Sequence, residues 1–251
     1  ALRAGDDVRS LIAHNHLNVK MAGCYCGLSD FADGSSHQSV EDMGVLRSIP
    51  GITILSPSDI TSTKEAIKAM MEYEGPVYIR LSRQEVSRIY PEDLRIEIGK
   101  AQRVREGKDV TIAVTGAPLA AVLNAADILK GEGIEAEILD YITVKPFDRN
   151  TLLESVAKTG LLVTVEEHSI CGGLGSSAAE TLGEVFPVAI KRIGMEDCFG
   201  ESGPYALLLE KYPEMSNKDV KLRIRERALD LGLPHNQQGW GKLDVARLLE
   251  D

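Results

Sequence analysis

Apolar and polar positions along the first ninety residues fall into short blocks, and each block has the spacing of one helix or strand. A loose helical stripe occupies residues 2–13, and a stronger one occupies 59–73, where Ser58 or Asp59 is expected to be the N-cap. Short apolar runs rich in β-branched residues, typical of buried strands, occupy 17–22, 51–56 and 77–82. Helices and strands therefore alternate, which predicts a parallel sheet with crossover helices and an α/β fold class.

A second block of alternating elements follows a stretch in which the periodicity fails and charged residues dominate. We interpret residues 94–108 of this stretch as a linker, partly extended at 94–98. Beyond it the pattern predicts strands at 110–116, 134–139, 161–167 and 188–192, helices at 117–130, 151–157 (capped by Asp148 or Asn150) and 177–182, and an irregular connection at 143–146. The tail from Tyr205 onward is expected to be mostly helical. The sequence therefore predicts two α/β domains, at 1–93 and 109–251.

One stretch between the first two strands is punctuated too densely for regular structure. Glycine, serine and aspartate dominate residues 27–36, so a loop is predicted there. The spacing turns helical over 37–47, with either of the two preceding serines as the cap. The pattern thus brings a carboxylate, Asp33, and an imidazole, His37, to a helix mouth, where open α/β sheets bind ligands. An Asx turn at Asp33 and a helix-start role for His37 are the alternative, and without further context the alternative is favoured.

The net charge of the chain limits the kinds of ligand that it is expected to bind. The 251-residue chain has a formal net charge of −10, so it carries no basic surplus for nucleic acid. A phosphorylated small substrate remains compatible, because it needs only a few local donors. The sequence contains no run that is long and apolar enough to cross a membrane and no signal peptide, so a cytoplasmic protein is expected.

The four cysteines do not form a metal-binding pattern. Cys24 and Cys26 are separated by one residue, which is tighter than the usual two-residue gap of a zinc site, and no second pair answers them. Cys171 and Cys198 stand far apart. Reduced cytosolic thiols are therefore expected.

Arg83 follows directly on the predicted strand at 77–82, at the edge where parallel sheets bind ligands. An arginine at this edge suits bidentate binding of a phosphate or carboxylate. A surface ion pair with Glu85 or Asp93 is the alternative, and we weigh the two equally.

A glycine-rich turn at 171–177 opens a helix after Glu166-Glu167-His168. Such a turn can hold an anion at the helix N-terminus. It lacks the lysine of a phosphate-binding P-loop, however, and does not have the spacing of the dinucleotide fingerprint. Close backbone packing or an interface is therefore the favoured use.

Several motifs occur together in one order along nearly the whole chain. They are Asp33-Gly-Ser-Ser-His-Gln, Glu41-Asp42, Leu46-Arg-Ser-Ile-Pro, Pro57-Ser-Asp59, Leu81-Ser-Arg-Gln, Val165-Glu-Glu-His, Gly172-Gly-Leu-Gly and Phe199-Gly-Glu-Ser-Gly. The set resembles the C-terminal half of transketolase. By this resemblance residues 1–93 are a partial pyrimidine-binding domain, truncated at its N-terminus, and 109–251 are a transketolase C-terminal domain.

The resemblance implies a transferase that uses thiamine diphosphate to move a two-carbon ketol unit between sugar phosphates, in carbohydrate metabolism such as the pentose phosphate pathway. Asp33 resembles the family's aspartate that contacts a substrate hydroxyl, and His37 resembles its active-site histidine. Arg83 resembles the phosphate-binding arginine. Tyr25 stands where the family usually has a second, substrate-binding histidine, so an altered acceptor side is expected.

Two family features have no counterpart in this sequence. The glutamate that protonates the pyrimidine belongs to a part of the domain that would precede Ala1, and no Gly-Asp-Gly metal motif occurs. We therefore expect the diphosphate and Mg²⁺ to be held by another chain, an N-terminal transketolase subunit. A homodimer through the C-terminal domain is expected as well. On this interpretation the chain is shortened at its N-terminus and inactive alone.

Three alternatives remain open. The related 1-deoxyxylulose-5-phosphate synthase and the β chains of 2-oxoacid dehydrogenases share the architecture, although Glu41-Asp42 and Leu81-Ser-Arg-Gln favour transketolase. A transketolase relative that acts on a sulfo- or branched sugar is compatible with Tyr25. Finally, the chain is compatible with a scaffold subunit that kept the fold and lost the chemistry.

Overall fold

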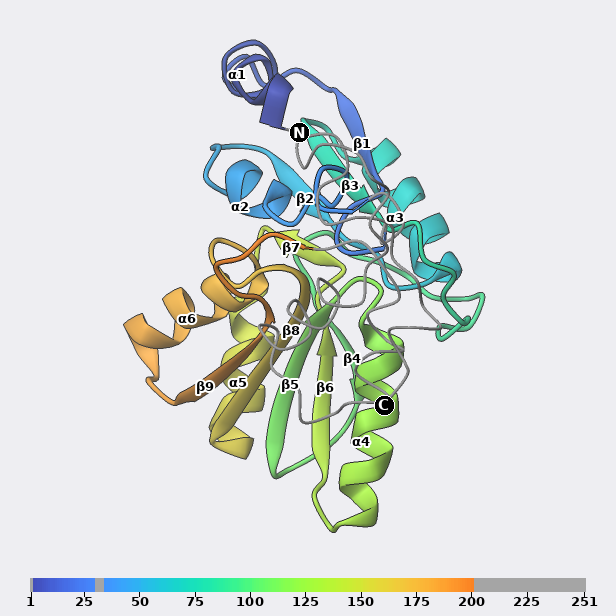
Figure 1. The fold of residues 1–251 in the computed structure, drawn as a ribbon, viewed down its shortest axis with the longest axis vertical. Helices are drawn as coiled ribbons and strands as arrows, with labels where there is room; N and C mark the ends of the chain where they lie inside the picture. The colour runs from blue at the N-terminus through green and yellow to red at the C-terminus, as the bar shows by residue number, and fades with distance from the viewer. Residues whose placement is uncertain (1, 30–33, 201–251) are drawn as a thin grey trace, which may run out of the picture. The chain divides into compact units, whose positions relative to one another are not determined.

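The computed structural model describes residues 2–29 and 34–200, and their strands form two sheets (Figure 1). The helical elements are η1 (Leu2–Ala4), α1 (Gly5–Asp7), η2 (Val8–Ala13), α2 (Asp42–Arg47), α3 (Ile60–Glu72), α4 (Leu119–Gly131), α5 (Arg149–Thr159) and α6 (Leu174–Val185). The strands are β1 (Lys20–Cys24), β2 (Thr53–Leu55), β3 (Val77–Leu81), β4 (Gln102–Arg105), β5 (Val110–Thr115), β6 (Ala136–Asp140), β7 (Thr143–Lys145), β8 (Leu161–Ser169) and β9 (Ala189–Met195). The predicted α/β class with parallel sheets is confirmed.

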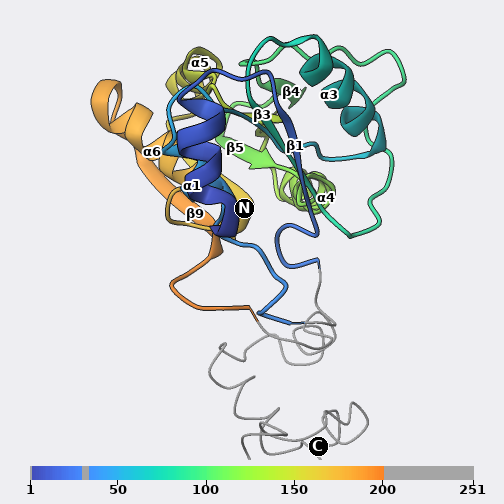
Figure 2. The same ribbon diagram turned by 90° about the horizontal axis from the view of Figure 1, so that it is seen from above.

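The first sheet has the strand order β1-β3-β2-β7. Its first three strands are parallel, and β7 pairs antiparallel with β2. Helix α3 packs its buried face, including Ala66 and Met70, on one side of the sheet. Helices α2 and η2 pack on the other side, where Met43 and Leu46 of α2 join Ile54 of β2 in one apolar cluster. Figure 2 shows the α1 helix and α3 on opposite sides of β1 and β3.

The second sheet has the order β4-β6-β5-β8-β9. Its strands are parallel except β4, which pairs antiparallel with β6. Helix α4 lies on one face and helices α5 and α6 lie on the other (Figure 1). This arrangement buries both faces of the central strands: every residue of β6 and all residues of β5 after Val110 are buried.

One apolar cluster belongs to both sheets. Leu55 and Ile79 of the first sheet pack in it with Ile112 and Ile138 of the second. The first sheet also takes β7 from the second half of the sequence, so the two halves share strand pairing as well as core. Among the described residues, the two sheets thus share one apolar cluster, and each sheet also has a cluster of its own.

Two predicted helix caps are confirmed. Asp59 accepts a hydrogen bond from the Ser62 backbone N–H, and the Ser62 hydroxyl accepts one from the Asp59 N–H, which makes a reciprocal capping box at α3. Asp148 accepts from the Thr151 N–H at the start of α5. Each cap satisfies backbone donors that would otherwise have no partner in the first helical turn.

Three local predictions are wrong. The connection at 143–146 is not irregular, because residues 143–145 form β7. The stretch at 94–108, interpreted as a linker, contains a regular element, because β4 forms at 102–105. Both strands are short edge strands, so pairing with a neighbour decides their conformation more than their own sequence does.

The third wrong prediction concerns the helix expected to begin at His37. Helix α2 begins at Asp42, with Glu41 at its N-cap and no capping side-chain hydrogen bond. His37 lies instead in a turn at 35–37. The tail predicted to be helical from Tyr205 lies outside the described residues.

None of the helices in the described part of the chain combines the length and the apolar content that a bilayer crossing requires.

Candidate functional site

The carboxyl ends of β1 and β3 bring Tyr25 and Arg83 together. The two strands are parallel neighbours, so the residues that follow them meet at one edge of the sheet. The Arg83 guanidinium carbon lies 5.3 Å from the centroid of the Tyr25 ring, a cation–π contact worth about 0.5–1 kcal/mol at an exposed position. The Tyr25 side chain remains 53% exposed. Two of the residues predicted to bind substrate therefore form one pair.

Tyr25 adopts a backbone conformation that a bulky side chain rarely takes. Its φ is +58°, in the left-handed region, which costs roughly 1 kcal/mol or more for a residue with a Cβ. Hydrogen bonds on the following residues hold it there: the Cys26 N–H donates to the carbonyl at the end of β3 (3.1 Å), and the Gly27 N–H donates to the Ser39 carbonyl (2.7 Å). The loop that presents the Tyr25 ring is thus fixed by its neighbours.

Ser29 links this loop to Arg83. Its hydroxyl donates to the Cys26 carbonyl (3.2 Å) and accepts from the Arg83 backbone N–H (3.0 Å). Ser29 is buried, so both hydrogen bonds are shielded from water. One hydroxyl therefore ties the residue that follows β3 to the loop that follows β1.

His37 lies in an exposed turn, not at a helix mouth. Its Nδ1 is 3.0 Å from the Ser36 hydroxyl. A parallel bridge between Cys26 and Ser39 joins the segment that carries His37 to the loop after β1. Asp33, predicted to contact a substrate hydroxyl, lies outside the described residues.

A buried ion pair lies beneath this edge of the sheet. The Arg80 Nε is 3.0 and 3.1 Å from the two Asp42 carboxylate oxygens, and both side chains are almost fully buried. The Tyr78 hydroxyl also donates to Asp42 (2.8 Å). The second Arg80 donor, Nη2, reaches the Ser39 carbonyl (3.2 Å) and the Glu167 carbonyl (2.7 Å). Removing one partner of such a pair typically costs about 3–5 kcal/mol, because it leaves the other charge buried and unpaired.

Glu166, the first residue of the motif Glu166-Glu167-His168, binds the start of helix α6. Glu166 accepts from the Leu174 and Gly175 N–H groups (2.7 and 2.8 Å), so its own carboxylate occupies the N-terminus of α6. Burial raises the pKa of Glu166 to about 7. An outside anion at this turn would have to displace that carboxylate. The favoured use, close packing, is supported by Gly172, where a Cβ would lie 2.8 Å from the Gly44 Cα.

His168 is buried and connects β8 to helix α2. Its Nε2 accepts from the Gly44 N–H (3.2 Å), and its Nδ1 lies 2.7 Å from the Ser169 carbonyl. Burial lowers the pKa of His168, and these partners fit the neutral ring with the proton on Nδ1. His168 therefore packs in the interior rather than facing substrate.

Burial also determines the protonation state of the Cys26 thiol. Burial, together with the nearby Asp42 carboxylate, raises its pKa to about 11. Such a thiol stays protonated at neutral pH and is a poor nucleophile. All four cysteines are free.

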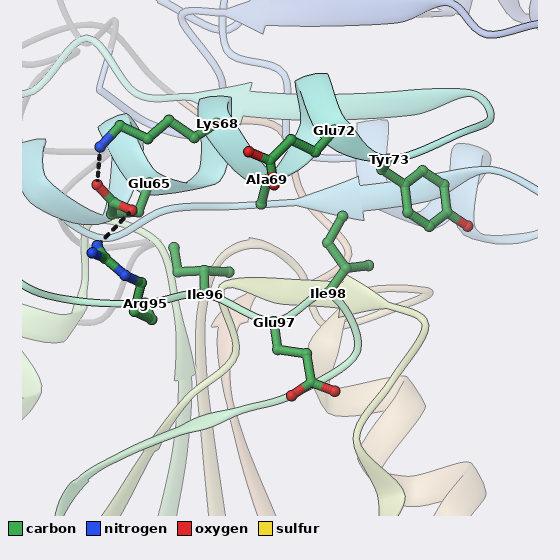
Figure 3. A pocket seen from close by; sticks show the side chains of 9 residues that line it. All are labelled: Glu65, Lys68, Ala69, Glu72, Tyr73, Arg95, Ile96, Glu97 and Ile98. Carbon is green, nitrogen blue, oxygen red and sulfur yellow. Dashed lines mark hydrogen bonds and ion pairs between the residues drawn. The ribbon is translucent and has the colours of Figure 1, made fainter.

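An open pocket of about 560 Å³ lies away from these residues, between α3 and the segment at 95–98 (Figure 3). Figure 3 shows Lys68 and Arg95 both directed toward Glu65. The Lys68 Nζ lies 2.5 Å from one Glu65 carboxylate oxygen, and the Arg95 Nη1 lies 3.6 Å from the other. Because both basic side chains of its lining pair with Glu65, this pocket offers no concentrated positive charge for an anionic substrate.

The described residues do not fit a magnesium diphosphate. Among residues 2–29 and 34–200, no three histidine, cysteine, aspartate or glutamate side chains are grouped in a way that could hold a metal ion.

Two residues of this region were missed by the sequence interpretation. Arg80 was assigned only to a strand, although a charged residue inside a buried run is itself a signal of a buried partner. Glu167 was known only as part of a motif, and its contact with the loop after β1 spans 139 positions of sequence. No local pattern reveals such a contact.

Family comparisons identify two domains. Residues 1–88 match the transketolase pyrimidine-binding domain, and residues 99–218 match the transketolase C-terminal domain.

Individual relatives of this chain also carry transketolase names. A 6-deoxy-6-sulfo-D-fructose transketolase subunit of Clostridium sp. (strain MSTE9) is 46% identical over 210 residues, which are 84% of this chain and 65% of that protein. A putative transketolase C-terminal section of Methanocaldococcus jannaschii is 39% identical over 227 residues, which are 89% of this chain and 71% of that protein. The chain thus spans about two thirds of the length of these curated relatives.

Among solved structures, a split-gene transketolase described as an inactive β4 tetramer superimposes with a TM-score of 0.75 and 42% identity, over 84% of this chain and 66% of that one. Two domain families in the same order, and close relatives that share them, lead to one conclusion. The chain belongs to the transketolase family, with a pyrimidine-binding domain followed by a transketolase C-terminal domain.

Proposed function

We propose that this chain is the C-terminal-section subunit of a split transketolase that transfers a two-carbon ketol unit between sugar phosphates. The observation that carries the proposal is the Tyr25–Arg83 pair at the carboxyl ends of β1 and β3. An arginine held at this edge suits the terminal phosphate of a sugar, because its planar fork matches a tetrahedral oxyanion. The relatives named above support the assignment to a subunit rather than a complete enzyme.

The proposal divides the work between two chains. Thiamine diphosphate, with Mg²⁺, would supply the carbon–carbon bond cleavage when bound, and the diphosphate-binding partner subunit would hold it. On this chain Arg83 and Tyr25 bind the substrate's anionic end, and Asp33 contacts a substrate hydroxyl. His37 handles protons at the substrate oxygens, a role that its exposed position in a turn permits.

The test is reconstitution of this subunit, extended by the N-terminal segment that carries the family's glutamate, with a diphosphate-binding transketolase subunit, thiamine diphosphate, Mg²⁺, a ketose phosphate donor and an aldose phosphate acceptor. Ketol transfer is expected from the mixture and from neither subunit alone. His37→Ala should lower kcat by about 10²–10⁴-fold, as the loss of a general acid–base usually does. His14→Ala, which changes another exposed histidine, is the matched control.

Two outcomes would contradict this proposal. Ketol transfer by the chain without a partner would remove the division of work. Full activity of the His37→Ala mixture would instead favour a scaffold subunit that no longer takes part in the chemistry.

A second candidate is a transketolase for an unusual sugar. Tyr25 departs from the family's usual histidine, and the Clostridium relative is named for a sulfo-sugar. An arginine beside an aromatic ring also suits a sulfonate, which is a tetrahedral oxyanion like phosphate. A panel of phosphorylated and sulfonated ketoses at matched concentration separates the two, since the better donor has the higher kcat/KM.

A further inference from the structure

Glu167 reaches from β8 of the second sheet to the loop after β1, and the proposed chemistry does not use this contact. Its Oε1 accepts the Leu28 N–H at 2.6 Å, and the Ser29 N–H also donates to this carboxylate. The other oxygen, Oε2, is buried and has no hydrogen-bond partner among the described residues. The carboxylate is therefore committed to one loop.

The loop closes on Glu167 without spare room. At Gly27, a Cβ would lie 2.5 Å from the Glu167 carboxyl carbon, and φ is +78°. Only glycine adopts this conformation at no steric cost and also allows the close approach. The position of the Glu167 carboxylate therefore sets the position of the loop.

The backbone of Glu167 is itself held by a buried arginine. The buried Arg80 donates to the Glu167 carbonyl and to the Ser39 carbonyl through one nitrogen. On the other side of the loop, the Ser29 hydroxyl accepts the Arg83 N–H. A continuous chain of hydrogen bonds thus runs from Arg80 through Glu167 and Ser29 to the backbone of Arg83.

We propose that Glu167 is a positioning residue for the substrate-anion site: its carboxylate holds the loop after β1 so that Tyr25 and Ser29 keep Arg83 in place. This inference rests on the proposed function, in which Tyr25 and Arg83 bind the terminal phosphate or sulfonate of the sugar. Glu167 does not touch the substrate. Its loss therefore weakens the binding of the anionic end and leaves the bond-breaking chemistry intact.

The experiment compares two acceptors in the assembled enzyme, an aldose phosphate and the unphosphorylated glycolaldehyde. Glu167→Ala is expected to raise KM for the phosphorylated acceptor about tenfold, the effect of about one lost charged hydrogen bond. KM for glycolaldehyde and kcat should stay within about threefold. Glu167→Gln should restore most of the affinity, because its amide oxygen can still accept the Leu28 N–H.

Two further variants make the test specific. Glu180→Ala removes a bidentate contact with Arg47 (2.6 and 2.8 Å), which also crosses between the two halves of the fold but does not touch the loop, so both KM values should stay unchanged. Ser29→Ala cuts the next hydrogen bond toward Arg83, and it should reproduce the selective KM rise even where Glu167→Ala fails to fold. Amide hydrogen exchange of residues 25–29 should accelerate in Glu167→Ala and not in Glu180→Ala.

The outcomes are separable. An active wild-type complex in which the Glu167 and Ser29 variants leave both KM values unchanged, or raise both equally, overturns the inference and leaves the proposed function standing. A wild-type complex without ketol transfer overturns the proposed function and the inference together.

Discussion

The buried carboxylate of Asp140 contributes to the pH dependence of the stability of this fold. It lies at the end of β6 and accepts hydrogen bonds from the Ser58 hydroxyl (2.7 Å) and the Tyr90 hydroxyl (2.8 Å). Burial raises the pKa of Asp140 to about 7, although these hydrogen bonds oppose the rise. The folded chain therefore keeps a proton that the unfolded chain releases.

Asp140→Asn should remove the part of the pH dependence that Asp140 contributes. Because the folded pKa exceeds the ordinary value of 3.8, wild type has its full stability at low pH and loses part of it as pH rises toward about 7. Asparagine keeps an acceptor for both hydroxyls and carries no proton. The free energy of unfolding of the variant minus that of wild type should therefore increase from pH 5 to 7 and level off above, measured by urea denaturation.

The matched control is Asp127→Asn. The Asp127 side chain is 67% exposed and pairs with Arg105 at the surface, so the change should cost less than about 1 kcal/mol. A difference between Asp140→Asn and wild type that stays constant from pH 5 to 8 would show that Asp140 does not titrate in this window.

The residue scale also shows why the candidate site was partly predictable. Arg83 was found because it follows a predicted strand, at the edge where parallel sheets bind ligands, whereas Tyr25 was found only through the family resemblance. Glu167 escaped because its glutamate type says nothing about a partner on a distant loop. The type of a residue suggests a role, but the topology of the fold determines whether its partner lies nearby.

At the scale of elements, helix starts and packed turns carry most of the local information. The caps at Asp59 and Asp148 were predictable, because a side chain and a backbone three residues on satisfy each other. Helix α2 was not, because it starts without a capping side chain. Strands β4 and β7 were missed because they form at sheet edges and depend on distant partners.

Two glycines near α6 give a prediction at this scale. Gly172 has φ +84° and lies where a Cβ would meet the Gly44 backbone, whereas Gly183 lies inside α6 with nothing within 4 Å of its Cβ position. Gly172→Ala should destabilise the fold by more than about 1 kcal/mol. Gly183→Ala should stabilise it by about 0.5–1 kcal/mol, because alanine is the better helix former.

Thermal unfolding of the two alanine variants beside wild type measures both effects. If Gly172→Ala unfolds at the wild-type temperature, the close approach of α6 and α2 at this point is not a constraint on the fold.

At the scale of the whole molecule, the two sheets depend on each other. Strand β7 completes the first sheet although it follows β6 in sequence, and Val144 of β7 is fully buried in the first sheet's cluster. A second cluster spans both sheets. Stability should therefore be shared, and the boundary between the predicted domains is not a boundary between independent cores.

A fragment of residues 1–98 tests this dependence. It lacks β7 and half of the shared cluster, so Ile54 and Leu55 would lose packing worth roughly 1.5–3 kcal/mol for each fully exposed side chain. We expect the fragment to show no cooperative transition in urea, monitored by circular dichroism, whereas the full chain unfolds cooperatively. A cooperative transition of the fragment would mean that the first sheet is self-sufficient.

The sequence by itself determined the alternation of helices and strands, the two caps and the family, because these depend on periodicity, on hydrogen bonds within a few residues, and on motifs that survive in order. Only the tertiary structure decided that Tyr25 stacks on Arg83, that Glu166 fills the α6 N-terminus and that Glu167 holds the loop after β1. These contacts join residues far apart in the chain. Their energies depend on burial and on distances of about 3 Å, which exist only once the sheets have packed.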